Sequence, residues 1–231
     1  MEARQEHLKE EKEFTRLRGE VSRHRRDMPW VKLDKEYLFD TERGKQSLAD
    51  LFEDCSQLIT YHFMFHPDWE QVCKSCSFVA NSYAGSAAHL KARNVSLVTV
   101  SKASLDQINT FKMRMGWDFP WVSSGPSDFN RDFHVSFTEE ELENASAYYN
   151  YRKMGFPEVE ALGISVFFKD DDGTVYHTYS SYGRGLDMFI TTYHLLDIVA
   201  KGRDEQDLPY SMAWIRHHDK YNDPNDSGSF H

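Results

Sequence analysis

The stretch QLITYHFMFHPDWEQVCKSC, residues 57–76, decides the fold. Its first part, residues 57–65, is rich in β-branched and aromatic side chains and carries few charges, which is typical of a strand buried on both faces. A His-Pro-Asp turn then ends the strand. After that turn we expect a helix over about residues 73–93, with one flexible point at Gly85.

Two cysteines three residues apart open that helix. At the first turn of a helix, unpaired N–H groups and the positive end of the dipole stabilise a thiolate, and the Lys74 ammonium adds to this effect if it lies near the sulfur. We therefore expect Cys73 to be the attacking thiol and Cys76, on the same helical face, to be the resolving thiol. The alternatives are a pair of small packed side chains or half of a zinc site, but no second ligand pair follows.

The residues after this helix predict a second strand and a second helix. VSLVTVS, residues 95–101, has the composition of another buried strand, and strand, helix and strand together form a βαβ unit. Residues 104–115 then predict a helix with Ser104 as its N-cap, which Gly116 ends.

Residues 116–137 are dense in glycine, proline, serine and aromatic side chains. We expect a structured loop or lid, because long irregular segments in compact domains are usually functional or disordered and the aromatic density argues against disorder. Some of its side chains are candidates for the wall of a pocket, with core packing as the alternative: Trp117, Trp121, Phe129, Asn130 and Phe133.

The last part of the chain predicts a helix, a hairpin and another helix. Thr138 and Glu141 form a capping box for a short helix through Tyr151. ISVFF and TVYHTYS, residues 164–168 and 174–180, flank an Asp-Gly turn and predict a β-hairpin. An amphipathic helix follows over about residues 186–200, and the polar end NDPNDSGSFH is expected to be disordered at its tip.

The N-terminal residues 2–27 alternate acidic and basic side chains at helical spacing beside a thin apolar stripe. They predict one amphipathic helix, which Pro29 stops. It lacks a strict coiled-coil seam, so we expect it to pack on its own chain, although a homodimer stays open. The expected organisation is this helix over residues 1–28, a main domain over 29–203, and an extension over 204–231.

Composition limits the partners. The 231 residues include 27 Lys and Arg against 37 Asp and Glu, a net charge of −10. Such an acidic chain is not suited to nucleic acid or anionic membranes as its main partner. No stretch has the length of a signal peptide core or a membrane span, which favours the cytoplasm. The three cysteines cannot all pair within one chain, and Cys55, outside the motif, is expected to be a buried spectator.

Several other side chains are candidates for supporting roles. His66 and Trp69 lie in the turn before the cysteines, and His66 could act as a general base or a metal ligand. His177 and Tyr179 alternate on one face of the predicted hairpin. His177 becomes a proton donor or third ligand if that face meets the cysteines, and is otherwise a core histidine. Arg184 lies between two glycines in a possible anion-binding turn.

Five segments carry a resemblance to a known family: PWV (29–31), SQLITYHFMF with DWEQVCKSCSF (56–78), RMGWDFPWVSS (114–124), DFNRDF (128–133) and HTYSSYGRG (177–185). The chain resembles a family of uncharacterised thioredoxin-like proteins that are predicted to be dithiol–disulfide oxidoreductases. The resemblance implies an α/β, thioredoxin-like fold: a central mixed sheet flanked by helices, here with an added N-terminal helix and a long aromatic-rich insertion.

The sequence departs from ordinary thioredoxins in two places. Thioredoxins have a cis-proline before the strand that faces the cysteines, whereas this chain has Leu162-Gly163-Ile164 near that place. The dipeptide between the cysteines is Lys-Ser rather than Gly-Pro. A peroxiredoxin-like activity is disfavoured as well, because Glu70 stands where those enzymes place the hydroxyl residue of P-x-x-x-[TS]-x-x-C.

Three functions therefore compete. The first is a thiol–disulfide oxidoreductase that acts on a protein or small-molecule thiol or disulfide and needs no cofactor beyond its own cysteine pair. The second is a metal-binding protein or metalloenzyme that holds copper, iron or zinc with Cys73, Cys76, His66 and His177. The third is a non-catalytic binding module that uses the fold as a scaffold.

Overall fold

The computed structural model describes residues 1–223. Its main sheet has eight strands, which in spatial order are β1 (Val31–Lys32), β10 (Val175–Tyr182), β9 (Gly163–Lys169), β4 (Gln57–His62), β5 (Val95–Ser101), β6 (Trp121–Ser123), β2 (Leu38–Thr41) and β3 (Gly44–Ser47). A separate hairpin pairs β7 (Ala147–Tyr149) with β8 (Arg152–Met154). The helices are α1 (Glu2–Arg26), α2 (Lys74–Tyr83), α3 (Ala87–Lys91), α4 (Leu105–Arg114), α5 (Phe129–Asp132), α6 (Glu139–Glu143) and α7 (Thr191–Leu196), with the 3-10 helices η1 (Asp50–Phe52) and η2 (Gly183–Phe189).

The four middle strands have the order and directions of a thioredoxin fold. β4 is parallel to β5, and α2 and α3 connect these two strands. On its other side β4 is antiparallel to β9, which forms an antiparallel hairpin with β10. α7 follows that hairpin. The predicted βαβ unit, hairpin and mixed sheet are therefore confirmed, and the fold is thioredoxin-like.

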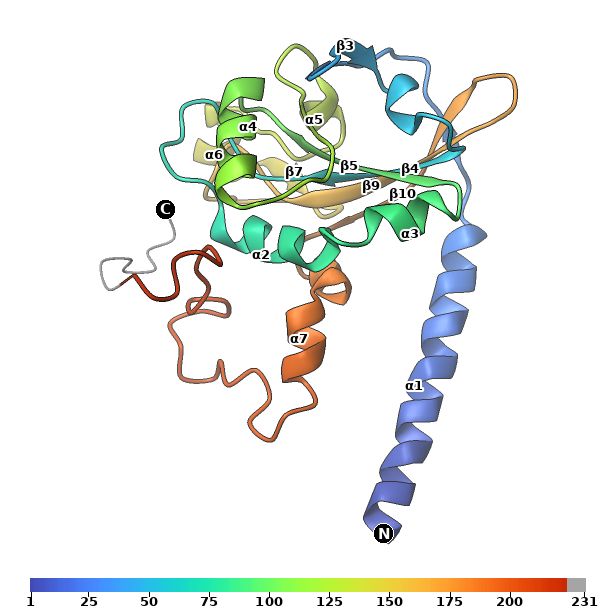
Figure 1. Cartoon of the computed structure of the whole chain (residues 1–231), viewed down its shortest axis with the longest axis vertical. Coiled ribbons are helices and arrows are strands. Elements are labelled where there is room, and N and C mark those ends of the chain that lie inside the picture. Colours follow the sequence, from blue (N-terminus) through green and yellow to red (C-terminus); the bar gives the residue numbers. More distant parts are fainter. Residues whose placement is uncertain (224–231) are drawn as a thin grey trace.

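The two faces of the sheet bury different clusters. Side chains alternate along β4, so Leu58 points into one cluster and Tyr61 into the other. The cluster around Tyr61 also contains Cys76 of α2 and Phe111 of α4, and we call it the helical-face cluster. The cluster around Leu58 is closed by η1, β2 and α5. In Figure 1, α2 and α3 lie along one side of the sheet, and α5 lies on the other.

The aromatic-rich stretch 116–137 is not a lid. It contains β6 and α5, and its rings are buried on both sides of the sheet: Trp117, Phe119 and Trp121 in the helical-face cluster, Phe129 and Phe133 in the other. Asn130 is buried as well. The structure shows the alternative, core packing, because strand alternation and the helical turn carry these side chains into the two cores.

Two predicted helices end differently. Thr138 and Glu141 do form the capping box of α6, but that helix ends at Glu143 and residues up to Met154 form the β7–β8 hairpin. The predicted helix over 186–200 is divided into η2 and α7. By contrast, Ser104 caps α4 as expected, and the helix after the cysteines is interrupted near Gly85.

Helix α1 extends away from the body of the molecule (Figure 1) and buries none of its residues. It is connected to the sheet through Trp30, whose ring lies 5.0 Å from that of Phe168. The Arg25 guanidinium also lies 4.7 Å from the ring of Tyr179. The expectation that α1 packs on its own chain is therefore wrong, because its apolar stripe is too narrow to hold it there.

The C-terminal segment, which the structure describes over residues 204–223, packs back against the main domain. Ile215 belongs to the helical-face cluster, and the Trp214 indole donates a 2.7 Å hydrogen bond to Glu205. The expected disordered tip lies largely outside the described residues, which end at 223. Across residues 1–223, no helix combines the length and apolar character needed to cross a membrane.

Candidate functional site

Cys73 is the N-cap residue of α2. Its sulfur accepts a hydrogen bond from the backbone N–H of Cys76 at 3.2 Å, so it satisfies one of the unpaired donors at the start of the helix. The side chain is only partly buried. The turn at residues 66–68 ends the strand, and α2 begins directly after Cys73. The cysteine therefore occupies the cap position.

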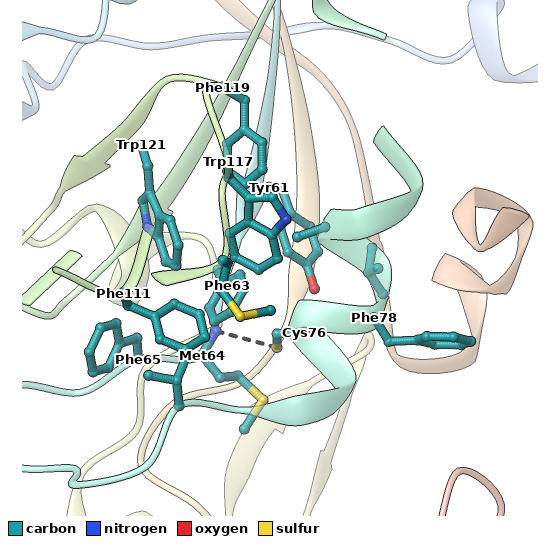
Figure 2. Packing of buried hydrophobic residues seen from close by; sticks show 14 of the residues in the cluster. Tyr61, Phe63, Met64, Phe65, Cys76, Phe78, Phe111, Trp117, Phe119 and Trp121 are labelled. Carbon is teal, nitrogen blue, oxygen red and sulfur yellow. Dashed lines mark hydrogen bonds between the residues drawn. The ribbon is translucent and has the colours of Figure 1, made fainter. Parts of the chain in front are cut away.

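Cys76 lies one turn further along α2 and is fully buried. Its sulfur accepts a hydrogen bond from the backbone N–H of Met64, where β4 has just ended, at 3.4 Å. Figure 2 shows this bond among the surrounding rings of Tyr61, Phe63 and Phe78. The two cysteines therefore share the first turn of α2 but differ in access to solvent.

The two thiols have opposite pKa shifts. A hydrogen bond from the Cys76 thiol is the largest influence on Cys73 and lowers its pKa, and the N–H groups of Cys76 and Ser75 add to this. Burial opposes the shift, and the Glu158 carboxylate also opposes it. Burial and the bond donated to Cys73 raise the pKa of Cys76 well above the ordinary value. Cys73 is therefore the thiol that ionises first.

Two further side chains adjoin the sulfurs. The Met64 thioether sulfur lies 4.0 Å from the Cys73 sulfur. The Tyr61 hydroxyl is buried next to Cys76. Burial raises the pKa of Tyr61 well above the ordinary value, and the neighbouring Cys76 thiol adds to this shift. Sequence reasoning missed both residues, because in the strand they read as ordinary core positions.

The residues predicted around the turn do surround the motif. Trp69 packs against the helical-face cluster together with Cys73. His66 lies 6.2 Å from the Trp69 ring, between ring centroids, and its Nδ1 accepts the backbone N–H of Asp68 at 3.3 Å. Lys74 is the first residue of α2. The structure thus brings these three predicted side chains to the same end of the sheet as the cysteines.

His177 and Tyr179 lie elsewhere. The His177 ring packs 5.2 Å from Phe133, in the cluster on the opposite face of the sheet, and its Nε2 lies 2.8 Å from the Ser180 hydroxyl. A β-bulge between His177 and Tyr179 shifts the pairing by one residue, so the two side chains do not share a face. The predicted alternation could not include this bulge, and His177 does not reach the cysteines.

Arg184 does not form an open anion-binding turn. Its guanidinium is paired with Asp187 at 2.6 Å and lies 5.9 Å from the Tyr193 ring. Cys55 is buried outside the motif, as expected for a spectator. Within residues 1–223, no three His, Cys, Asp or Glu side chains are grouped as ligands for one ion. The histidine-based metal site is therefore not assembled in this part of the chain.

His217 is a residue of the site that sequence reasoning missed. It is buried, and its Nε2 lies 3.0 Å from the carbonyl oxygen of Val72, next to Cys73. Burial and the nearby Arg114 lower its pKa to about 4, so at neutral pH the ring is uncharged and donates to that carbonyl. It thereby fixes the C-terminal segment to the loop directly before Cys73. In the sequence, only the two adjacent histidines at 217 and 218 drew attention to this position.

A cavity of about 700 Å³ adjoins this loop. Its wall includes Trp69, Lys74 and His217, together with residues of α4. The Cys73 side chain is not part of that wall. Leu162, in the segment before β9, packs against the helical-face cluster, as Cys73 does.

Gly163 begins β9 beside that segment, where thioredoxins have their cis-proline. It pairs with His62 at the end of β4. A Cβ atom at this position would lie 2.9 Å from the Tyr182 ring. The close approach of that ring explains why the position lacks a side chain.

Similar solved structures include a PrxQ mutant from Xylella fastidiosa (12% identity, 69% of this chain and 88% of that chain, TM-score 0.43) and the peroxidoxin BcpB from Mycobacterium tuberculosis (14%, 73% and 96%, 0.44). A putative thiol:disulfide interchange protein DsbE from Chlorobium tepidum is also similar (13%, 71% and 97%, 0.43). At such low identities and scores, these structures carry no information about the chemistry of Cys73.

Among curated proteins, no sequence matches. The profile of a bacterial protein family of unknown function, DUF899, matches residues 1–221. That match extends over α1, the whole sheet and most of the C-terminal segment. The chain therefore belongs to the DUF899 family.

Proposed function

We propose that this protein is a thiol–disulfide oxidoreductase in which Cys73 attacks and Cys76 resolves. The observation that carries the proposal is the asymmetry of the pair. Cys73 is a partly exposed helix cap with a lowered pKa, whereas Cys76 is buried beside it with a raised pKa. Exchange chemistry needs this combination, because one sulfur must ionise and be accessible while its partner is held in reserve.

The reaction has two steps. The Cys73 thiolate attacks a disulfide of the substrate, forms a mixed disulfide and releases one substrate thiolate. Loss of negative charge from the Cys73 sulfur removes one influence that raises the pKa of Cys76. Cys76 then loses its proton and attacks the Cys73 sulfur, which forms the internal disulfide and releases the second substrate thiolate. The substrate gains two electrons and the cysteine pair loses them.

The substrate must reach Cys73 beside Met64, whose thioether sulfur lies 4.0 Å from the Cys73 sulfur. We infer a disulfide on a protein or a small molecule as substrate, with no added cofactor. We also infer the cytoplasm as its compartment, where thiol pools keep the pair reduced between turnovers.

Intact-mass analysis of the reduced protein treated with oxidised glutathione tests the proposal. The wild type should finish with an internal disulfide and no retained glutathione. The Cys76→Ser variant should hold one glutathione on Cys73, because the resolving thiol is missing. The Cys73→Ser variant should gain no glutathione at position 76, because the Cys76 sulfur is buried.

The matched control is Cys55→Ser, which removes a buried thiol outside the motif and should behave as the wild type. Tryptic mapping would locate each adduct. A Cys73→Ser variant that reacts as fast as the wild type, or a wild type that never forms the internal disulfide, would contradict the proposal.

A further inference from the structure

Three sulfur atoms of different residues meet where α2 begins. The Cys73 sulfur lies 4.0 Å from the thioether sulfur of Met64 and accepts a hydrogen bond from the Cys76 thiol. Met64 is also joined to Cys76 directly, through its backbone N–H. Each of the three residues is thus in contact with the other two. Thiol–disulfide exchange uses two of these sulfurs and leaves Met64 without a role.

The measured distance between two of these sulfurs matches one edge of a trigonal metal site. A metal ion about 2.3 Å from each of three sulfurs in one plane spaces the sulfurs about 4 Å apart. The 4.0 Å between Met64 and Cys73 equals one edge of such a triangle. The Cys76 sulfur is held beside these two atoms by the hydrogen bond that it accepts from the Met64 backbone N–H and the one that it donates to Cys73.

The surroundings select the metal. Met64 and Cys76 are buried among apolar and aromatic side chains of the helical-face cluster, and Figure 2 shows how closely the rings surround them. In the part of the chain that the structure describes, no further His, Asp or Glu joins the cysteines to make a set of three. Zinc and iron need more ligands, or harder ones, whereas thiolate and thioether sulfurs select Cu(I).

We propose that Cys73, Cys76 and Met64 bind one Cu(I) ion. Binding forms three copper–sulfur bonds and releases the two thiol protons, while the thioether stays neutral and the copper keeps its oxidation state. The partly exposed Cys73 is the point of entry, because it can take the ion from a copper–thiolate complex by exchange of ligands. Since the same thiols form the internal disulfide, the oxidised protein cannot hold the ion.

Anaerobic titration with Cu(I) in competition with bathocuproine disulfonate, followed by X-ray absorption at the copper edge, tests this site. The wild type should bind one Cu(I) per chain with three sulfur neighbours. Met64→Leu keeps the apolar volume but removes the thioether, so it should leave two sulfur neighbours and weaken binding about tenfold or more. Zn(II) added in equal amount should not displace the copper.

The matched control is Met154→Leu, which changes a partly buried methionine in a different cluster and should bind as the wild type. Two sulfur neighbours in the wild type, or unchanged affinity and sulfur count in Met64→Leu, would overturn the site. The wild-type sulfur count decides this even if the variant folds poorly.

The glutathione assay separates this inference from the proposed exchange reaction. Met64→Leu retains both cysteines and should still form the internal disulfide. Loss of tight copper binding with retained exchange supports the methionine ligand, whereas a wild type that forms the disulfide but binds no Cu(I) overturns only the copper site.

Discussion

Cys73 and Cys76 show how one turn of helix makes two chemically different thiols. Both sulfurs belong to the same four-residue motif, yet Cys73 caps the helix and accepts hydrogen bonds, whereas Cys76 donates one from a buried position. The motif and its place after a strand were readable from the sequence, because helix ends have fixed unpaired donors. The contacts of Met64 and Tyr61 were not, since a strand pattern gives only the face on which a side chain lies.

Glu160, three positions before Gly163, is a second residue whose environment changes its pKa. It is buried, and its two carboxylate oxygens accept hydrogen bonds from the Asn130 amide at 2.9 Å and the Ser136 hydroxyl at 2.5 Å. These bonds lower its pKa, but burial outweighs them and raises the pKa to about 7. Folding therefore favours the protonated acid at mildly acidic pH.

We predict that Glu160 makes stability depend on pH. Between the ordinary pKa of 4.5 and the raised pKa of about 7, the folded state binds more protons at Glu160 than the unfolded state, so the contribution of Glu160 to stability falls as pH rises. In urea unfolding at a series of pH values, the stability of the wild type relative to Glu160→Gln should decrease by up to about 3 kcal/mol across this window and then level off. A difference that stays constant with pH, or rises with it, would contradict the raised pKa.

At the scale of elements, strand boundaries and caps followed local rules, whereas one irregularity changed the site. β5 spans the predicted residues 95–101, and Ser104 caps α4 as predicted. The bulge in β10 broke the alternation between His177 and Tyr179 and placed His177 on the other face of the sheet. A bulge arises from pairing with a neighbouring strand, so a period of two read along one strand does not reveal it.

A second prediction concerns the open end of the β9–β10 hairpin, where Gly163 pairs with Tyr182. Gly163→Ala should destabilise the fold by about 1–3 kcal/mol, because the new Cβ would lie 2.9 Å from the Tyr182 ring. Gly155→Ala is the control, since its Cβ would meet Ala145 at an ordinary 3.6 Å. Urea unfolding of both variants measures the difference. Equal stability of the two would mean that the Tyr182 ring can move away at no cost.

At the scale of the whole molecule, the sheet separates the cysteines from much of the buried polar network. Cys76 lies on the helical face, whereas His62 stacks on Phe129 on the other face and is linked through Ser165 to Ser180. Burial lowers the pKa of His62 to about 3, so that ring is neutral in the folded protein. The sheet thus keeps it apart from thiol chemistry.

A further prediction concerns the contribution of helix α1 to stability. Deletion of residues 1–27 should change the free energy of unfolding by no more than about 0.5 kcal/mol, because α1 buries no residue. The internal disulfide should form as before. Urea unfolding and sedimentation of both chains provide the measurement. A large loss of stability, or a dimer that dissociates on deletion, would show that the apolar stripe with Phe14, Leu17 and Val21 packs against a second copy.

The sequence by itself determined the βαβ unit, the β9–β10 hairpin, the cysteine pair at the start of α2 and the end of α1. These follow from periodicity, caps and turns, which act between residues close in the chain. Only the tertiary structure decided that His217 supports the cysteine loop, that Met64 joins the sulfurs, and that His177 does not. Those outcomes depend on register and packing between segments as far apart as Val72 and His217, and no local pattern encodes them.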